Sequence, residues 1–408
     1  EESDRIFADT NALAQDTYDY IIDAIFGVSL NREVGGNYAR VIDHVNQMHA
    51  YKIAVDIPSG IHADTGLVMG RAFLADETVT FAYKKAGLLL GVAKKYCGRI
   101  ESVDIGITKE SFQGRIPGQF SYQREDIQRI IPKRSLLSNK GSFGKVLLIA
   151  GCREIGGACI LSAKSLYRSG CGYVRVLTHE ANRDLLLSQV PEAVLTTYND
   201  TALDIRAIKS AFDFATVIVI GPGLGEGEMA RELLRYALME TQLPMVIDAD
   251  AINLISKDPV LRDALLEHAK IRDVILTPHP LELQRFSGLD IANIRSRLLD
   301  AGREIADKLH VVLVCKNAAT VVFDGRRARH LPDTYINQSG NDGLATAGSG
   351  DVLSGIIGAL LAGGLDAMKS ASMGVYLHGL CADLAAEDGS KSYLNAGDLT
   401  DFLKFLLE

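Results

Sequence analysis

The sequence has no apolar run that approaches the ~20 residues needed to cross a bilayer, because Gly and Ser interrupt its longest apolar stretches. It also lacks an excess of positive charge: the formal net charge is −8 and the isoelectric point is about 5.7. The chain therefore has no excess of basic residues with which to bind a polyanion. These two absences argue against a membrane-spanning protein and against nucleic acid as a partner.

Cysteine and histidine are present, but without the spacing that disulfide frameworks or zinc sites require. Six cysteines occur without any Cys-x-x-Cys pair, mostly inside apolar runs, and nine histidines show no zinc-type pairing. We therefore expect buried free thiols in a reducing compartment and no structural metal. No secretion or transit segment is recognisable, so a cytoplasmic location is expected, although the sequence begins at Glu1 rather than Met.

The composition is that of globular material, with 47% apolar and 23% charged residues. At 408 residues the chain is too long for one ordinary core, so two domains are expected. Gly, Arg and Pro cluster at residues 113–118, which places the boundary there and gives domains 1–118 and 119–408. The first has room for about four strands, which is short for a doubly wound domain, so an N-terminal part is expected to be missing.

Apolar strand-like runs alternate with helical patterns along the whole chain. This alternation favours an α/β fold, with parallel sheets covered by helices on both faces. A hairpin is expected near one sheet edge, from residues 319–324 and 328–331 around Gly325-Arg326. The expected strands are residues 20–25, 52–56, 77–81, 145–150, 173–178, 217–220, 244–248, 274–277 and 311–315, with helices at 161–169 and 229–241.

A Gly-rich turn, an acid and the start of an apolar helix follow one another in residues 341–351. Gly343, Gly348 and Gly350 let backbone N–H groups approach an anion, and the helix that begins near Gly350 turns its positive end towards it. A carboxylate gains nothing from a neighbouring phosphate, so Asp351 is best explained as the base that takes a proton from an attacking hydroxyl. An ordinary helix N-cap is the alternative for this acid.

The same Gly cluster follows a long polar loop, residues 331–341, instead of a β-branched strand. A dinucleotide-binding Rossmann fingerprint requires the cluster to follow a strand directly, so that class of site is disfavoured here. The apolar residues 352–363 after the loop predict a buried helix that holds the loop in place.

Further motifs lie at the ends of expected strands, and such ends line the ligand crevice of an open α/β sheet. The loop Gly221–Gly225 is a candidate wall of the crevice, and a tight turn explains it equally well. His279 stands between two prolines that could aim it into the crevice, although a structural role is commoner for a lone histidine. Asp248 and Asp250 could assist a cation or cap the next helix, and Lys316 could contact a nucleotide or be solvated.

In the first domain, Asp23 and the stretch Asp56–Ser59 place acids and a hydroxyl beside tight turns at strand ends. Carboxylate, hydroxyl and carbonyl oxygens gathered there would suit a hard cation such as potassium, or a ribose. Ordinary turn chemistry accounts for each motif taken singly.

Taken together these motifs resemble the bifunctional NAD(P)H-hydrate repair enzymes, in which an NAD(P)HX epimerase domain precedes an ADP-dependent NAD(P)HX dehydratase domain. The resemblance implies a ribokinase-like three-layer αβα domain preceded by a partial Rossmann-like α/β domain. It runs through nearly the whole chain and is most specific from residue 120 onwards. The motifs found there in the family's order are Lys140-Gly141-x-x-Gly144, Gly156-Gly157-Ala158, Gly221–Gly225, Asp248-Ala249-Asp250-Ala251, Thr277-Pro278-His279-Pro280 and Asn341–Asp351.

The resemblance implies a repair reaction on a hydrated nicotinamide cofactor. ADP, with Mg²⁺, phosphorylates the 6-hydroxyl of (6S)-NAD(P)HX, and phosphate then departs to restore NAD(P)H. Asp351 is then the catalytic base and a substrate contact. The other implied contacts are Ala158, Gly223, Gly225 and His279 for the hydrated cofactor, and Lys316, Asn317, Ala318, Ala319, Thr320, Gly348, Ser349 and Gly350 for the nucleotide.

The first domain is similar to the later half of the epimerase, which interconverts the R and S forms. Asp23 and Ser59 stand at the potassium-site positions and Asp56 at a substrate position. The residues implied to bind the substrate's phosphates are Gly27, Val28, Ser29, Leu30, Asn31, Arg32 and Glu33. The family's Asn-Asn-Gly-Gly-Asp-Gly motif does not occur in this sequence, which puts the epimerase activity in doubt. A homo-oligomer is expected.

Two other function classes are compatible with parts of the pattern. A kinase for a small hydroxylated precursor, of the hydroxymethylpyrimidine or hydroxyethylthiazole type, would use the same loop and Asp351 but release a stable phosphorylated product. A non-catalytic nucleotide-binding scaffold is the third class. An acid beside phosphate is of no use to a mere binder, which argues against that class.

Overall fold

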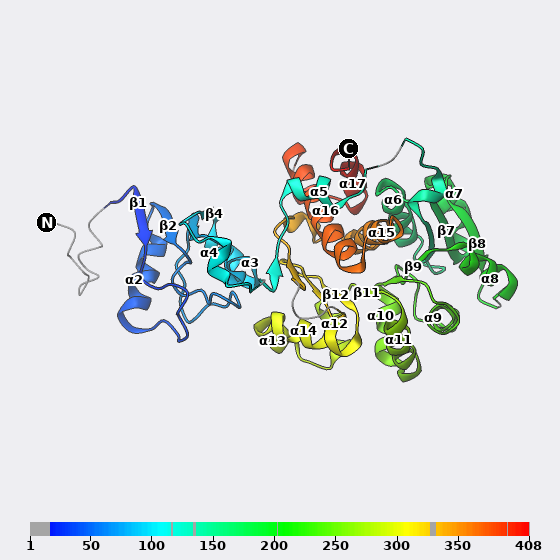
Figure 1. Ribbon diagram of the computed structural model, residues 1–408, viewed down its shortest axis with the longest axis horizontal. Helices are drawn as coiled ribbons and strands as arrows, with labels where there is room; N and C mark the ends of the chain where they lie inside the picture. Colours follow the sequence, from blue (N-terminus) through cyan, green and yellow to red (C-terminus); the bar gives the residue numbers. More distant parts are fainter. Residues whose placement is uncertain are drawn as a thin grey trace. The chain divides into compact units, whose positions relative to one another are not determined.

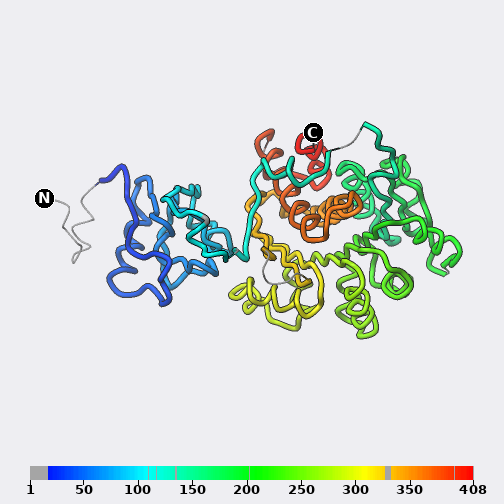
Figure 2. Tube along the Cα trace, in the orientation of Figure 1, coloured from blue at the N-terminus to red at the C-terminus, as the bar shows by residue number. Residues whose placement is uncertain are grey.

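The computed structural model describes residues 17–115, 117–133, 136–201, 203–326, 332–389 and 391–407. The chain divides into two compact units, the first made mainly of the residues before Pro117 and the second mainly of those after it. Figure 1 colours the first unit blue to cyan and the second cyan to red, and the chain can be followed as a tube in Figure 2. Each unit is built on its own sheet.

The first unit has a sheet of four parallel strands in the order β1-β2-β3-β4. Its core contains Ile42, Val45 and Phe73, of which the first two come from the apolar face of helix α2. Of the two acids predicted to be functional, Asp23 is the last residue of β1 and Asp56 directly follows β2. The elements are β1 (Tyr20–Asp23), α2 (Gly36–Gln47), β2 (Tyr51–Val55), β3 (Glu77–Phe81), α3 (Ala86–Leu89), α4 (Lys94–Cys97) and β4 (Arg99–Val103).

The second unit has a sheet of ten strands within the described residues, in the order β5-β14-β13-β12-β11-β10-β9-β6-β7-β8. The strands from β12 to β8 along this order are parallel, whereas β13 runs antiparallel to both β12 and β14. The strands are β5 (Gln119–Phe120), β6 (Lys145–Ile149), β7 (Tyr173–His179), β8 (Val194–Tyr198), β9 (Val217–Ile220), β10 (Met245–Ile247), β11 (Val274–Leu276), β12 (Val312–Cys315), β13 (Val321–Asp324) and β14 (Thr334–Ile336).

Helices cover both faces of this sheet, which gives three layers. Figure 1 shows α6, α15, α16 and α17 on one face and α9, α10, α11 and α12 on the other. The helices are α5 (Arg124–Ile130), α6 (Gly157–Arg168), α7 (Arg183–Gln189), α8 (Ile205–Phe214), α9 (Glu228–Glu240), α10 (Ala249–Lys257), α11 (Pro259–Ile271), α12 (Pro280–Ser287), α13 (Ile291–Ser296), α14 (Leu298–Leu309), α15 (Ser349–Ala362), α16 (Ala367–Asp388) and α17 (Ala396–Phe402).

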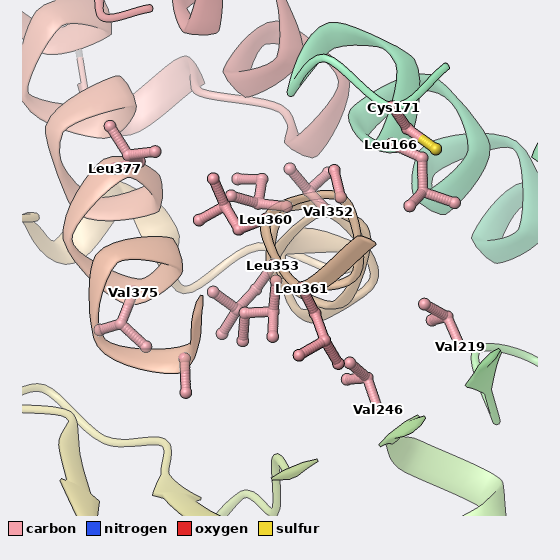
Figure 3. Packing of buried hydrophobic residues seen from close by; sticks show 14 of the residues in the cluster. Leu166, Cys171, Val219, Val246, Val352, Leu353, Leu360, Leu361, Val375 and Leu377 are labelled. Carbon is pink, nitrogen blue, oxygen red and sulfur yellow. The ribbon is translucent and has the colours of Figure 1, made fainter. Parts of the chain in front are cut away.

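Helix α15 is the central element of its layer, and residues 352–361 are all buried, as the apolar sequence predicts. Figure 3 shows its side chains pointing towards α6, α16 and the strands β9 and β10. Glycines permit the close approach: a Cβ atom on Gly355 would lie 1.9 Å from Ser165 Oγ, and one on Gly358 would lie 2.4 Å from Val219 Cγ2. Helix α15 therefore holds its N-terminal loop rigidly over the sheet.

The first strand of the predicted hairpin is present as β13, which pairs antiparallel with β12 and with β14. The predicted second strand, residues 328–331, lies outside the described residues and stays a prediction. One sequence prediction needs correction. The predicted polar loop at 331–341 contains the strand β14, whose Tyr335 is fully buried. In the part of the chain that the structure describes, no helix combines the length and the apolar character that a membrane crossing needs.

Candidate active site

Four neighbouring parallel strands end at one edge of the large sheet, and most of the predicted motifs follow them directly. Gly221–Gly225 follows β9, Asp248 follows β10, the segment Thr277–His279 follows β11, and Lys316 follows β12. The carboxyl ends of parallel strands meet at the same edge, so strand order brings residues nearly 100 positions apart into one place. The N-terminus of α15 lies above the same edge, since this helix packs on β9 and β10.

The loop before α15 is shaped as an anion cradle. Gly348 caps the helix with a left-handed backbone, φ 90°, and contributes no side-chain cap bond. This positive φ favours glycine, and a Cβ atom at Gly348 would also lie 2.4 Å from Leu161 Cδ1. The Ser349 hydroxyl donates to the Leu344 carbonyl over 2.9 Å, which fixes the loop from within. The first-turn N–H groups of α15 have no partners inside the helix and carry its positive end.

Asp351 lies in the first turn of this helix, with its carboxylate facing the loop. Its backbone carbonyl accepts a hydrogen bond from the Ser162 hydroxyl over 2.9 Å, but no described residue donates a hydrogen bond to its carboxylate. Burial, reinforced by the negative charge of Asp248, raises the pKa of Asp351 to about 7, although Lys316 opposes the shift. Gly348 is the helix N-cap, so the alternative that Asp351 caps the helix is wrong.

Lys316 is not a solvated turn lysine. Its Nζ lies 2.7 Å from Asp248 Oδ1, and the two side chains are only 19% and 1% exposed. Burial opposes both charges, but each group stabilises the other, so the pKa of Asp248 is lowered and that of Lys316 is raised. A Cβ atom at Gly350 would lie 3.4 Å from Lys316 Nζ, so the ammonium lies against the first turn of α15. The site thus combines a fixed cation, a cradle of amides and an acid.

The residues that follow Lys316 form the tight connection between β12 and β13. Asn317 and Ala318 are exposed, whereas Ala319 is buried. The Asn317 carboxamide accepts from the N–H of Ala318 over 2.8 Å, and the Thr320 hydroxyl donates to the Asn317 carbonyl over 3.2 Å. This turn lies at the sheet edge next to the anion cradle, because Lys316 links the two.

Three residues predicted to contact the hydrated cofactor come together beside the loop after β9. A Cβ atom on Gly223 would lie 2.9 Å from the Cβ of Ala158 in α6, so these two residues are in direct contact. Gly223 adopts φ 57°, a left-handed conformation that suits glycine. The N–H of Gly225 donates to Asp250 Oδ2 over 2.8 Å, which gives Asp250 a structural role in this loop. Neither helix capping nor cation binding by Asp250 is needed to explain its position.

His279 is placed differently from its expected role. It is the N-cap of α12, and its Nδ1 accepts hydrogen bonds from the N–H groups of Leu281 and Glu282 over 3.1 and 3.3 Å. Its Nε2 lies 3.3 Å from Glu282 Oε1, and the side chain remains 44% exposed. Burial, with Lys316 nearby, lowers the pKa of His279, which favours the neutral form of the ring. The histidine thus has a structural function, with part of its ring still accessible at the crevice.

In the first unit, Asp23 and Ser59 form one buried cluster. Asp23 Oδ1 accepts from the Ser59 hydroxyl over 2.6 Å, and its Oδ2 accepts from the Ser59 N–H over 2.7 Å. Burial raises the pKa of Asp23 despite these hydrogen bonds. Of the residues predicted to bind substrate phosphates, Leu30 is buried, and the others are exposed on the loop after β1: Gly27, Val28, Ser29, Asn31, Arg32 and Glu33.

Asp56 has a strained backbone, with φ 67°, and its carboxylate is held by several donors. Its Oδ1 accepts from the Lys85 ammonium, the Thr80 hydroxyl and the N–H of Phe81. Burial would raise the pKa of this acid, but these donors outweigh it and lower the pKa. Lys85 was not predicted from the sequence. Its place shortly after the predicted strand that ends at Phe81 could have indicated it.

No group of three or more His, Cys, Asp or Glu side chains in the described part of the chain is arranged to hold a metal ion. A monovalent cation does not need such a group, because it binds hydroxyl and carbonyl oxygens as well as carboxylates. The Asp23 carboxylate, the Ser59 hydroxyl and the Phe26 carbonyl lie together, with the hydroxyl 3.4 Å from that carbonyl. This donor set fits potassium chemistry.

Comparison with known proteins gives consistent results over both units. A family model described as NAD(P)H-hydrate dehydratase matches residues 146–404, and one described as YjeF-related protein N-terminus matches residues 2–87. The bifunctional NAD(P)H-hydrate repair enzyme Nnr of Coxiella burnetii is 37% identical over 387 residues, which cover 95% of this chain and 75% of that protein. The enzyme of the same name from Escherichia coli is 34% identical over 396 residues, 97% and 73% of the two chains.

Solved structures match about seven tenths of the chain. A ribokinase-like superfamily protein from Enterococcus faecalis has a TM-score of 0.63 and 30% identity, and covers 71% of this chain and 96% of its own. An ADP/ATP-dependent NAD(P)H-hydrate dehydratase from Bacillus subtilis, co-crystallised with ATP and Mg²⁺, has a TM-score of 0.59 and 29% identity, with 70% and 96% covered. The predicted ribokinase-like α/β fold is confirmed.

Proposed function

The chain belongs to the bifunctional NAD(P)H-hydrate repair enzymes, and from this membership we propose that its second unit dehydrates (6S)-NAD(P)HX with ADP, using Asp351 as base. The single observation that carries the assignment of the base is the free carboxylate of Asp351 at the anion cradle. A pKa of about 7 suits a general base at neutral pH, because the group is substantially ionised and still basic enough to accept a proton.

The first chemical step is phosphoryl transfer. Asp351 removes the proton from the 6-hydroxyl of the hydrated nicotinamide as that oxygen attacks the terminal phosphorus of ADP. The new O–P bond forms while the bond to the bridging oxygen breaks, and AMP leaves with the negative charge. The N–H groups of Gly348–Gly350 and the Lys316 ammonium stabilise charge on the transferring group.

The second step is elimination. Hydroxide is a poor leaving group, whereas the phosphate ester formed in the first step departs readily. The C6–O bond breaks as phosphate leaves, and loss of the C5 proton restores the ring double bond of NAD(P)H. One ADP and one hydrated cofactor therefore give AMP, phosphate, a proton and the reduced cofactor.

The surrounding residues divide between the two ligands. We assign the turn Lys316–Thr320 to the nucleotide, since it adjoins the anion cradle. The cluster of Ala158, Gly223 and Gly225, with the accessible part of the His279 ring, is assigned to the hydrated cofactor. Mg²⁺ would arrive bound to the nucleotide phosphates, which are its preferred ligands in such enzymes.

For the first unit we propose epimerisation of NAD(P)HX. Asp23 and Ser59 would hold a potassium ion, and the exposed loop after β1, residues 27–33, would contact the substrate's phosphates. Asp56, fixed by Lys85, would contact the substrate. We also propose a cytoplasmic enzyme that forms a homo-oligomer. Five of the six cysteines are buried free thiols, which supports the first of these two proposals.

The function is tested by incubating the protein with (6S)-NAD(P)HX, ADP and Mg²⁺ while the absorbance of the reduced nicotinamide is recorded. We expect absorbance to return with one phosphate released per cofactor restored. A stable product heavier by one phosphate would indicate a kinase instead. No return of absorbance with either ADP or ATP would refute the dehydratase assignment.

A further inference from the structure

One buried carboxylate links the lysine of the active site to the catalytic helix. Asp248 Oδ1 lies 2.7 Å from Lys316 Nζ, and Asp248 Oδ2 accepts a hydrogen bond from the Ser354 hydroxyl over 2.5 Å. Ser354 lies in α15, one turn after Asp351, so the same acid connects the end of β12 to the helix that carries the base. Both oxygens of Asp248 thus have hydrogen-bonding partners inside the protein.

The backbone around Asp248 is arranged to place its side chain inside. Asp248 occupies the N-cap position of α10, where aspartate is favoured, yet its side chain makes no cap bond. Ala249 adopts a left-handed conformation, φ 48°, a strained geometry for alanine. Gly221 makes room for this turn, because a Cβ atom there would lie 1.8 Å from the Asp248 carbonyl oxygen. The backbone is therefore strained and α10 lacks a side-chain cap bond, whereas the Asp248 side chain is free to bind Lys316.

Lysine is a flexible point charge whose long side chain loses substantial rotamer freedom when it is fixed. A Cβ atom on Gly350 would lie 3.4 Å from the Lys316 ammonium, which therefore lies beside the proposed phosphate-binding loop. Among the described residues, Asp248 is the only hydrogen-bond acceptor for this ammonium.

We propose that Asp248 is a positioning residue for phosphoryl transfer: its buried carboxylate holds the Lys316 ammonium against the Gly348–Gly350 cradle. The inference rests on the proposed function, because it assigns Asp248 a role in that same reaction. Asp248 contacts neither ligand; it acts through Lys316.

The pH profile distinguishes this role from a purely structural one. The titratable groups around the site are Asp248, Asp250, Lys316, Glu282, His279, Cys159 and His378. Asp248 raises the pKa of Asp351 and Lys316 lowers it. Removing the charge of Asp248 therefore moves the acid limb of the rate profile to lower pH, whereas removing that of Lys316 moves it to higher pH.

The experiment compares Asp248→Asn, Lys316→Met and the double variant with the wild type, in the full chain. The matched control is Asp258→Asn, which also removes an aspartate from an ion pair. Asp258 Oδ2 lies 2.7 Å from Arg231 Nε. Arg231 lies in α9 and Asp258 is the N-cap of α11, so this pair is outside the site. Asparagine at 258 can still cap α11, so kcat and the pH profile of the control should stay at the wild-type values.

For Asp248→Asn we expect kcat to fall by about a hundredfold, as for a misplaced catalytic group, with the acid limb at lower pH. The double variant removes both buried charges, so it should fold even if Asp248→Asn alone does not. We expect it to remain as impaired as Lys316→Met. Recovery of wild-type kcat in the double variant would reduce the ion pair to a structural role and overturn the inference.

Two further outcomes would also overturn it. One is an Asp248→Asn enzyme whose kcat and acid limb match the wild type. The other is a variant whose defect is relieved by excess Mg²⁺ with an unchanged acid limb, which would make Asp248 a metal ligand. An inactive wild type would instead refute the proposed function, so the two failures can be told apart.

Discussion

At the scale of single residues, the chemistry depends on the contrast between two acids at one sheet edge. Asp248 is fully engaged by Lys316 and Ser354 and stays ionised, whereas the Asp351 carboxylate has no donor among the described residues. Burial, reinforced by the charge of Asp248, outweighs the opposing charge of Lys316 and raises the pKa of Asp351 to about 7. Asp248 is paired with the Lys316 ammonium and remains charged, whereas Asp351 is unpaired among the described residues and can accept and release a proton.

The pKa of Asp351 predicts how activity depends on pH. The base must be ionised to accept a proton, so kcat/KM should rise with pH through about 7 and reach a plateau above it. Below that pH the rate should fall tenfold per pH unit, because the ionised fraction falls by that factor. The check is a pH series of kcat/KM for dehydration, and an acid limb near the ordinary aspartate pKa would contradict the prediction.

His279 offers a test that separates capping from substrate binding. Asparagine is at least as good an N-cap, so His279→Asn should leave the unfolding midpoint unchanged. If the exposed part of the ring contacts the hydrated cofactor, the KM for that cofactor should rise by roughly three- to tenfold, which is the usual effect of losing one hydrogen bond. An unchanged KM together with unchanged stability would limit His279 to capping α12.

The sequence indicated much of this site but not its internal pairing. Gly348, Asp351 and Lys316 were identifiable because each lies in a recognisable motif or at a strand end. The ion pair between Asp248 and Lys316 was not predictable, since it depends on which strands are neighbours in the sheet. The cap made by His279 was missed because capping is favoured for smaller polar residues.

At the scale of elements, the long apolar strands were predictable, whereas several exposed or very short strands were not. Strands such as β6 and β9 are continuous apolar runs, which is typical of parallel strands covered on both faces. Strands β4 and β8 are mostly exposed or half-buried and lie at sheet edges, so polar residues interrupt their pattern. Strand β5 has only two residues and leaves no periodic signal.

The close packing of α15 gives a stability prediction for this element. Gly358→Ala places a Cβ atom 2.4 Å from Val219 Cγ2, so the helix must shift away from β9. We expect a loss of about 1–3 kcal/mol in the free energy of unfolding, measured by urea titration. The control is Gly397→Ala in α17, where the added atom meets nothing within 4 Å and stability should not fall. Equal stability of the two variants would contradict the packing argument.

At the scale of the whole molecule, the chain combines two units whose chemistry concerns one damaged cofactor. Each unit has its own parallel sheet and its own hydrophobic clusters. In each, polar side chains follow the carboxyl ends of adjacent strands, which is the general location of ligand sites in open α/β sheets. The family relationship unites the two sites, since its members are named as bifunctional repair enzymes.

Nucleotide binding should be confined to the second unit. We expect ADP with Mg²⁺ to slow amide hydrogen exchange in residues 316–320 and 348–352, because a bound ligand suppresses local opening. Strands β1–β4 should exchange at the same rate with and without nucleotide. Mass spectrometry of peptides from the full chain makes this comparison, and protection limited to the first unit would show that the nucleotide site is assigned to the wrong unit.

The central claim is that Asp351 serves as the base in nucleotide-dependent dehydration, and a single substitution tests it most directly. Asp351→Asn keeps the shape of the side chain but cannot accept a proton, so kcat should fall by roughly 10²–10⁴-fold. The Kd for ADP should stay close to the wild-type value, because the amides of the cradle and Lys316 are retained. An Asp351→Asn enzyme that restores NAD(P)H at the wild-type rate would contradict the account.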